Sequence, residues 1–552
     1  MSETWTIRSG TLLDADLGLR RADLRLSGGR IDEIAPVLDP APRDLDATGL
    51  TVAPGFIDIH CHSEFAAFVY PLAESKVLAG VTTDVSGNCG ASPFPLVGEF
   101  LERRRAEWRA HGLAIDWHSA AGYYARAASA PSSVNRALLA GHGALRAAVV
   151  GYAGRPATPD ERRRMRRLLD EALQAGAFGL SSGLIYPPGC YADAEELADL
   201  ARPVAEAGGY YASHIRSEGD RLLEAVDEFL EVVRSSGVRG QVSHLKASGP
   251  RNWPKAGQAI DRLRRARDEG LDVSADRYPY LASMTDLDSL LLPKWAVEGG
   301  REEELARLAD PATRRRIADE IRKAHPEPDY FDRITVAAVH PDRPQDAVGK
   351  TLRELADLAG RDALQAAFDL LRDHQTQVNA TYLSMSEENL RAILAEPYVA
   401  IGSDSSLRHL PPVFRLRPSG FAGQVAEATA GRPDAAAERA GLPHPRAYGT
   451  PARFLGTYVR DLGLVDWREG IRRLTRLPAD IVGLKDRGRL AEGAWADLVI
   501  FDRDRIADRA TYAHPWAAPD GIRHVFVNGE RVVADGRHTG ATPGRVLKRE
   551  GT

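Results

Sequence analysis

The sequence predicts an α/β fold in which a (β/α)8 barrel of the TIM type carries a small β domain formed by both chain ends. From residue 54 to about residue 480, short apolar strands alternate with helical stretches, a pattern typical of parallel βα units. Eight such strands can be placed, which is the number that closes this kind of barrel. The predicted strands end at His62, Asn88, Tyr152, Ser182, His214, Lys246, Tyr280 and Asp404.

Helical patterns fill the connections between these strands. The clearest helices are expected over residues 160–174, 194–207, 220–235 and 260–269. The alternation loosens over about 286–374, where the sequence predicts a helix over 301–324 and an extra strand over 333–340. We interpret this stretch as an insertion on a βα connection, placed where it could cover the barrel mouth. Residues 422–446 are rich in Ala, Pro and Gly and predict a long loop.

Both chain ends have a β-rich texture that the middle lacks. Near the N-terminus, alternating strands over 22–27 and 30–34 flank a Gly28-Gly29 turn. Near the C-terminus, strands are expected over 496–501 and 524–533, the latter turning at Asn528-Gly529. Because chain ends often lie close together, we expect residues 1–53 and 481–552 to form one composite β domain beside a catalytic barrel of residues 54–480.

Composition excludes several classes of protein. The chain has 552 residues, a formal net charge of −5 and 43% hydrophobic residues, which gives no case for a nucleic-acid partner. Its three cysteines are too few for a disulfide framework and suit a reducing compartment. No leader-like apolar stretch follows the N-terminus, and no apolar run approaches the ~20 residues that span a bilayer. We expect a cytoplasmic protein, monomeric or a small homo-oligomer, without a membrane partner.

His60 and His62 stand two residues apart at the end of the apolar run that begins at Pro54. Residues two apart in a strand point to the same face, so both imidazoles would point the same way. Two convergent neutral imidazoles at the end of a buried strand are suitable ligands for a metal ion. Such a pair taken alone is more often a surface or core feature, so the prediction depends on partners elsewhere in the chain.

Other strand ends supply the partners. Cys89, His214, His244 and Asp404 each stand where a predicted strand stops. Each alone has an ordinary alternative, namely a buried thiol, a core histidine or a helix N-cap. Because the carboxyl ends of barrel strands meet at one face, the joint pattern predicts a single metal site. Six candidate ligands indicate two divalent ions, with zinc preferred for cysteine and histidine.

The sequence also indicates how two ions could be bridged and how an anion could be held beside them. No lysine occurs between Lys76 and Lys246, so the Cys89 thiolate is the natural bridge. Lys246 lies two residues past His244, a spacing that places it on the same strand face as that histidine. Arg216 stands in the same relation to His214. We expect both cations beside the metals, where they could hold a carboxylate, although Lys246 could also be an ordinary exposed cation.

One motif points to a different chemistry and is rejected. Residues 179–183 match G-x-S-x-G, the nucleophile elbow of serine hydrolases. That elbow requires a helix directly after it. Here Pro187, Pro188 and Gly189 follow, which excludes a helix of useful length.

On its longest motifs the chain resembles the N-acyl-D-amino-acid deacylase (D-aminoacylase) family of the amidohydrolase superfamily. The resemblance runs over nearly the whole chain and is weakest in the insertion. The Gly-Asn-Cys-Gly segment is its most family-specific part because it carries the cysteine ligand. The matching segments are residues 54–60, 74–76, 80–83, 87–90, 179–189, 212–216, 243–247, 278–280, 402–404, 444–446 and 448–450.

The resemblance implies a metal-dependent hydrolase barrel with a small β-sandwich from both termini. It implies that Cys89, His214 and His244 hold the tighter zinc, and that His60, His62 and Asp404 share a weaker second site. Asp404 matches the proton-transfer residue. Lys246 and a tyrosine of the Tyr278-Pro279-Tyr280 segment match the groups that hold the substrate's carboxylate. The segment after Asp404 is unusually rich in arginine, and we expect one of these, with Arg415 as the candidate, to contact that carboxylate as well.

The expected activity is zinc-dependent hydrolysis of the amide bond of N-acyl-D-amino acids, with a metal-activated water as nucleophile. Asp404 would take the proton of the water and pass it to the leaving amine. The alternatives are a cyclic-amide hydrolase or deaminase on the same scaffold, and a non-catalytic binding protein. The lack of a lysine bridge argues against the hydantoinase type. The preference for D over L substrates comes from the resemblance and not from the residues themselves.

Overall fold

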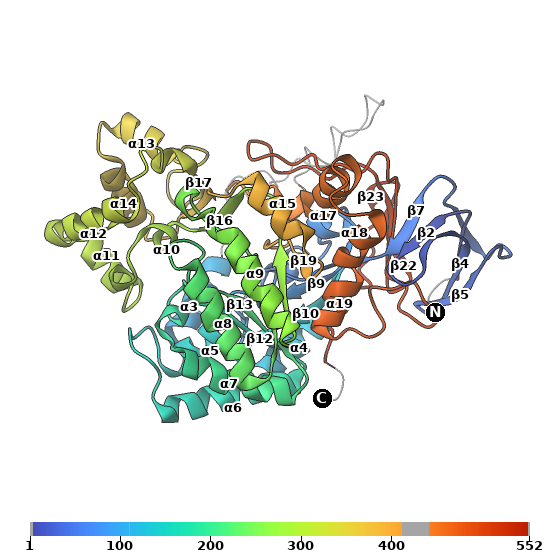
Figure 1. The fold of residues 1–552 in the computed structure, drawn as a ribbon, viewed down its shortest axis with the longest axis horizontal. Helices are drawn as coiled ribbons and strands as arrows, with labels where there is room; N and C mark the ends of the chain where they lie inside the picture. Colours follow the sequence, from blue (N-terminus) through green and yellow to red (C-terminus); the bar gives the residue numbers. More distant parts are fainter. Residues whose placement is uncertain (1–3, 110, 411–440, 550–552) are drawn as a thin grey trace.

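A set of parallel strands surrounded by helices forms the centre of the protein (Figure 1). The computed structural model describes residues 4–109, 111–410 and 441–549. The central strands are β8 (Phe56–Asp58), β9 (Val81–Ser86), β10 (Asn135–Leu138), β11 (Ala140–Gly141), β12 (Gly179–Gly183), β13 (Tyr210–His214), β14 (Arg239–Val242), β15 (Val273–Arg277) and β19 (Val399–Ile401). They pair in parallel in two runs, β8-β9-β10 and β11-β12-β13-β14-β15-β19.

The two runs of strands are joined at both ends. Leu139 alone separates β10 from β11, so these two pieces form one interrupted strand. A parallel bridge between Cys61 and Ser405 links the segment after β8 to the segment after β19. Asp404 donates its backbone N–H to the carbonyl of His60 at 2.8 Å, beside that bridge. The segments that follow the strands are thereby gathered at one end of the set.

Amphipathic helices cover the outside of these strands. The helix α6 begins with a capping box of Thr158 and Glu161, carries a proline in its first turn and ends at Gly176. The helices expected over 160–174, 194–207, 220–235 and 260–269 each lie within about five residues of the predicted range. The main helices beside the strands are α3 (Gly98–Arg109), α4 (Ala120–Ala128), α5 (His142–Val149), α6 (Pro159–Ala175), α7 (Ala194–Glu206), α8 (Leu222–Ser236), α9 (Lys255–Asp268), α15 (Glu387–Ala395), α17 (Arg446–Arg453), α18 (Trp467–Leu474) and α19 (Arg476–Val482).

The predicted third strand, which was to end at Tyr152, is wrong. Residues 142–149 form the helix α5, and the third strand is the interrupted pair β10 and β11. The strand β10 carries Asn135 and Arg136, so half of it is polar and its apolar signal is weak. Several other strands end earlier than predicted, with β8 ending at Asp58 and β15 ending at Arg277. The predicted site residues therefore lie mostly on the loops just beyond the strands.

The insertion has its own sheet and its own apolar core. Its antiparallel strands pair in the order β16-β18-β17, so it begins and ends outside the predicted 286–374. The single helix expected over 301–324 is two helices, because Asp310 caps a new helix with Pro311 in its first position. Its elements are β16 (Ala282–Asp286), α10 (Leu287–Leu291), α11 (Arg301–Ala309), α12 (Pro311–Ala324), β17 (Ile334–Ala338), α13 (Leu352–Ala359), α14 (Ala363–Asp373) and β18 (Asn379–Leu383).

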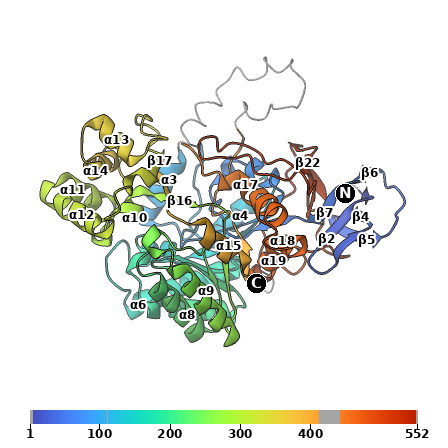
Figure 2. The same cartoon turned by 45° about the horizontal axis from the view of Figure 1, so that its top comes forward.

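Strands from both chain ends share one sheet, on the opposite side of the molecule from the insertion (Figures 1 and 2). This sheet has the order β23-β22-β21-β20-β7-β2-β3, and a second sheet has the order β5-β4-β1-β6. Trp5, Leu24, Leu498 and Phe526 contribute to the apolar core of this unit. The strands are β1 (Trp5–Arg8), β2 (Thr11–Asp14), β3 (Gly18–Arg21), β4 (Asp23–Ser27), β5 (Arg30–Ala35), β6 (Arg43–Asp46), β7 (Thr51–Pro54), β20 (Leu498–Phe501), β21 (Ile522–Val527), β22 (Glu530–Ala534) and β23 (Arg537–His538).

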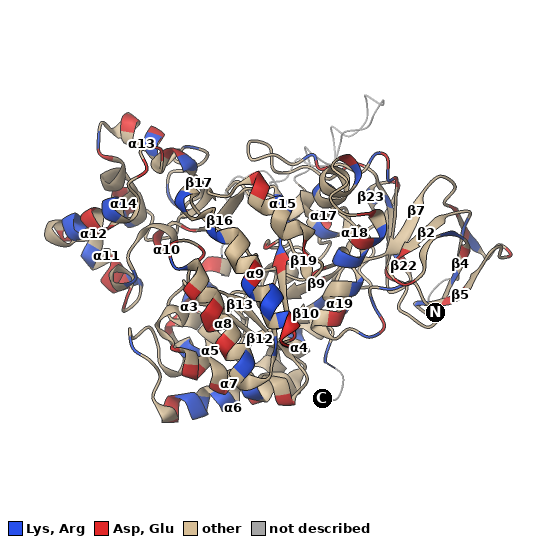
Figure 3. Ribbon diagram, in the orientation of Figure 1, with Lys and Arg blue, Asp and Glu red and all other residues tan. Residues whose placement is uncertain are grey.

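Charge on the outer helices is mixed in sign, as the near-neutral net charge leads one to expect (Figure 3). Among the described residues, none of the helices is both long and apolar enough to cross a membrane. Most of the predicted loop over 422–446 lies outside the described residues, and Arg446 at its end opens the helix α17.

Glu304 is a buried carboxyl group on α11 of the insertion. The residue is 5% exposed, and its Oε1 has no hydrogen-bond partner among the described residues. Burial, together with the charge of Asp288, raises the pKa of Glu304 to about 9. The folded protein therefore binds this proton more tightly than the unfolded chain does, and its stability falls as the pH rises from about 4.3, the ordinary glutamate pKa, towards about 9.

Replacing Glu304 by glutamine should remove this loss of stability. We expect the thermal unfolding temperature of E304Q, relative to the parent protein, to increase steadily between about pH 5 and pH 9. Glu302, which is exposed on the same helix, provides the matched control, and E302Q should show no such trend. A difference between E304Q and the parent that stays constant over this pH range would contradict the prediction.

Candidate active site

The thiol of Cys89 is surrounded by three imidazoles at the end of the central strands. Its Sγ lies 3.3 Å from Nε2 of His60, 3.6 Å from Nε2 of His244 and 3.8 Å from Nδ1 of His214. All four residues are buried. His214 ends the strand β13, and the other three residues lie on the segments that follow β8, β9 and β14, so the fold brings together residues more than 100 positions apart in the sequence.

Asp404 and His62 complete this cluster on one side. Oδ1 of Asp404 lies 3.1 Å from Nε2 of His62 and 3.5 Å from Nε2 of His60. The other oxygen, Oδ2, lies 2.8 Å from Nη1 of Arg446. Burial by itself would raise the pKa of Asp404, but the charges of Arg446 and His244 hold it well below its usual range. Asp404 is therefore an ionised carboxylate.

Unusual backbone conformations aim three of these side chains. The φ angles of Cys89, His244 and Asp404 are +53°, +36° and +51°, in the left-handed region that non-glycine residues seldom adopt. Two residues before Cys89, Gly87 could carry no side chain, because a Cβ there would lie 2.3 Å from the carbonyl oxygen of Leu139. Strained backbone of this kind persists where the surrounding structure holds it, and it is concentrated at functional sites.

The carboxylate of Asp276 contacts two residues of the cluster from behind, the imidazole of His60 and the backbone of His244. Its Oδ2 accepts from Nδ1 of His60 at 3.1 Å, and its Oδ1 accepts from the backbone N–H of His244 at 3.0 Å. A carboxylate can only accept here, so the Nδ1 of His60 carries a proton, and its Nε2 is the nitrogen that faces Cys89 and Asp404. This carboxylate–imidazole arrangement is the usual support of a metal-binding histidine.

The donor set fits a zinc ion. Two groups of residues each bring one possible ligand atom per residue to within 4.8 Å of the others, and His244 belongs to both groups. Burial would raise the pKa of Cys89, but the charge of His60 and hydrogen bonds with the other two histidines hold it well below its usual range, so the sulfur is a thiolate. Thiolate, imidazole and carboxylate together suit zinc. The two groups are His60, Cys89, His244 and Asp404, and His214, Glu218 and His244.

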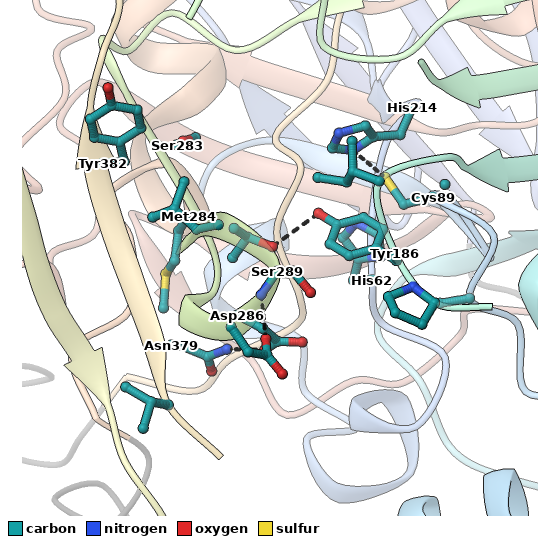
Figure 4. A pocket seen from close by; sticks show the side chains of 18 of the residues that line it. His62, Cys89, Tyr186, His214, Ser283, Met284, Asp286, Ser289, Asn379 and Tyr382 are labelled. Atoms are coloured by element: carbon teal, nitrogen blue, oxygen red, sulfur yellow. Dashed lines mark hydrogen bonds between the residues drawn. The ribbon is translucent and has the colours of Figure 1, made fainter. Parts of the chain in front are cut away.

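A cavity of about 1520 Å³ opens over the cluster. Figure 4 shows Tyr186 between Cys89 and His214 on one side and Met284 and Ser289 of the insertion on the other. The hydroxyl of Tyr186 is hydrogen-bonded to Thr285 at 2.9 Å, and its ring lies 5.1 Å from that of His214. The insertion therefore forms one wall of the cavity.

Lys246 and Tyr278, two of the residues proposed from the sequence to bind the substrate, line this cavity. The hydroxyl of Tyr278 is buried and has no partner among the described residues. Tyr280 is placed differently, because its hydroxyl donates to Asp508 at 2.7 Å and the residue does not line the cavity. Of the two tyrosines left open by the sequence, the geometry therefore favours Tyr278.

The two arginines expected to contact the substrate have different outcomes. Arg216 lines the cavity, but its guanidinium donates to both carboxylate oxygens of Glu228 and to the carbonyls of Cys190 and Ala192. The N–H groups of Arg216 are therefore hydrogen-bonded within the protein, and the geometry does not favour Arg216 as a contact of the substrate. Arg415 lies outside the described residues.

Sequence reasoning missed three functional candidates. Arg446 was noted only as part of a family motif, yet it is buried, lines the cavity and lies 4.6 Å above the ring of Tyr278. Asp276 is the penultimate residue of the strand β15, so the search of strand ends for ligand-type residues could have found it. Glu218 offered no such signal, because it lies within a polar loop after β13.

Comparison with known proteins identifies the family of this chain. A family model described as the amidohydrolase family matches residues 44–533. The chain is 36% identical to an N-acyl-D-glutamate deacylase of Alcaligenes xylosoxydans xylosoxydans, covering 99% of this chain and 96% of that protein. It is 33% identical to a D-aminoacylase of the same organism, covering 98% and 97%.

A solved structure is similar over the same length. It is an N-acyl-D-glutamate deacylase from Bordetella bronchiseptica, complexed with zinc and a phosphonate inhibitor that mimics the tetrahedral intermediate of the reaction. The identity is 32%, the TM-score is 0.79, and the match covers 99% of this chain and 100% of that one. The fold and the site define an amidohydrolase. Within that family the chain belongs to the N-acyl-D-amino-acid deacylases, which confirms the resemblance predicted from the sequence.

Replacing Cys89 should remove tightly bound metal. We expect C89A to retain much less zinc than the parent protein after dialysis against a chelator, because the central thiolate of the cluster is lost. Cys190 is also buried but lies outside the cluster, so C190A is the matched control and should keep its zinc. The measurement is the zinc content per chain by elemental analysis. A C89A protein with the full zinc content would show that Cys89 is not a ligand.

Proposed function

We propose that this protein hydrolyses the amide bond of N-acyl-D-amino acids and releases a carboxylate and the free D-amino acid. The observation that carries the proposal is the buried thiolate, imidazole and carboxylate cluster beside a cavity wall with two cations. Zinc bound by such ligands supplies a water with a pKa of about 7 and polarises a carbonyl oxygen. Two of the relatives are named as an N-acyl-D-glutamate deacylase and a D-aminoacylase, and these names support the proposed substrate class.

Asp404 is suited to transfer the proton in this reaction. It is ionised, buried and faces both His60 and His62 on the cavity side. We infer that its carboxylate accepts the proton of the attacking water and passes it to the leaving amine nitrogen. The ion pair with Arg446 holds the carboxylate in place while this occurs.

The carboxylate of the amino acid would be held by the cations that lie around Tyr278 on the cavity wall. The ammonium of Lys246 and the guanidinium of Arg446 lie 5.8 Å and 4.6 Å from the centre of the Tyr278 ring. Two cations and an unpartnered phenol hydroxyl that share one wall form a suitable site for a carboxylate. We propose that these residues orient the substrate so that its amide carbonyl lies at the cluster.

We propose that the cluster holds two metal ions. We infer a tighter ion held by Cys89, His214 and His244 and a looser ion held by His60, His62 and Asp404.

The strand order and the Cys61–Ser405 bridge support a (β/α)8 barrel over about 54–480, with a β-sandwich from residues 1–53 and 481–552. The three free, buried cysteines support a reducing compartment.

A substrate panel tests the activity directly. Purified protein loaded with zinc should release free amino acid from N-acetyl-D-amino acids with acidic, neutral or apolar side chains, and much less from the matching L-compounds. Removal of zinc by a chelator should abolish the activity, and added zinc should restore it. Protein that holds zinc but leaves every N-acyl-D-amino acid intact would refute the proposed function, and preferential opening of cyclic amides would favour the alternative.

The two tyrosines of the Tyr278-Pro279-Tyr280 segment allow a matched test of carboxylate binding. In Y278F the substrate loses one hydrogen bond of about 1 kcal/mol, so KM should rise roughly fivefold while kcat changes little. Y280F should leave KM unchanged, because the hydroxyl of Tyr280 is bonded to Asp508 outside the cavity. The outcome that would contradict the assignment is a larger rise of KM in Y280F than in Y278F.

A further inference from the structure

Glu218 lies at a junction between the metal cluster and the cation that would hold the substrate. Its Oε1 is 2.9 Å from Nδ1 of His244 and forms a short ion pair with Nζ of Lys246. The same oxygen is 3.8 Å from Nε2 of His214. The side chain is 15% exposed and comes from the loop between β13 and α8. Lys246 itself is nearly completely buried.

The contact between Lys246 and His244 creates a conflict. Nζ of Lys246 lies only 2.7 Å from Nδ1 of His244, and an ammonium can only donate. If Lys246 donated to Nδ1, the proton of the neutral imidazole would have to be on Nε2. That nitrogen lies 3.6 Å from the Cys89 thiolate and is the one that a metal in the cluster would need unprotonated.

A carboxylate at the position of Glu218 resolves this conflict, because it can accept from both groups. The imidazole of His244 then keeps its proton on Nδ1 and leaves Nε2 free for a metal, and Lys246 donates to the carboxylate instead. We propose that Glu218 is a positioning residue that selects the metal-binding tautomer of His244 against the competing ammonium of Lys246. This inference rests on the proposal that Cys89, His214 and His244 hold zinc.

Two observations argue against Glu218 as a direct metal ligand. Glu218 contacts His244 at Nδ1, whereas the Nε2 of the same imidazole faces Cys89 in the other group. A neutral imidazole has only one nitrogen free to bind a metal, so it cannot serve both groups at once. The oxygen of Glu218 that would face such an ion is also already in contact with the ammonium of Lys246.

Zinc affinity of the full-length protein tests the inference without relying on activity. Apo-protein would be titrated with zinc in competition with a chromophoric chelator. E218L removes the acceptor, and we expect it to bind zinc about 10- to 100-fold more weakly, the usual effect of losing a carboxylate behind a metal-binding histidine. E218Q keeps one acceptor oxygen and should lose less than about tenfold. Asp220, two residues away, pairs with Arg251 instead, so D220N should bind zinc like the parent protein.

The double variant E218L/K246M distinguishes this role from general damage to the fold. Because K246M removes the competing donor, the double variant should bind zinc more tightly than E218L alone. The inference is overturned if E218L binds zinc like the parent, if K246M recovers nothing, or if E218L binds one ion fewer at saturating zinc, which would make Glu218 a ligand. Should E218L not fold, the same comparison between E218Q and E218Q/K246M decides.

A failure of this inference is distinguishable from a failure of the proposed function. If the parent protein binds no zinc at all, the proposed metal site is wrong. If the parent binds zinc tightly and the Glu218 variants do the same, the metal site stands and the role of Glu218 is refuted.

Discussion

The pairing of buried charges is the constraint on which the site depends. A charge removed from water is tolerated only when an opposite charge or several hydrogen bonds compensate it. Lys76 is 1% exposed, and its Nζ lies 2.6 Å from the carboxylate of Asp58. The same ammonium donates to the sulfur of Cys61 at 3.2 Å and to the hydroxyl of Ser403 at 3.0 Å. One buried ion pair thus joins the segment that carries the first two histidines to the segment that carries Asp404.

The same rule organises the rest of the site. The negative charges of the thiolate and the carboxylates lie among imidazoles, a lysine and an arginine, so each anion has a cation or a hydrogen-bond donor close to it. Asp404 is ionised because Arg446 and the histidines are beside it, and this makes it competent to accept a proton. Asp276 and Glu218 hold two imidazoles from behind, which leaves the opposite nitrogens pointing at Cys89. This arrangement of donors suits a divalent ion.

Most of the candidate metal-binding cluster could be predicted from the sequence because its residues follow apolar strands. The rule that barrel strands place their carboxyl ends at one face brought His60, Cys89, His244 and Asp404 together in the prediction, and the structure brings them together in space. The third strand was misplaced, because half of β10 is polar while the apolar residues that follow it belong to a helix. Hydrophobic periodicity alone does not distinguish a short polar strand from a loop.

The sequence by itself determined the parallel βα pattern, the β-rich chain ends, the family and the types of residue that can bind a metal, because each of these is written in local composition or spacing. The tertiary structure decided which tyrosine faces the cavity, that the donors of Arg216 are taken up within the protein, and that Arg446 enters the site from a helix more than 40 residues beyond Asp404. It also decided that Glu218 lies between His244 and Lys246. These are contacts between distant loops, and their partners are set by packing and charge compensation rather than by any local pattern.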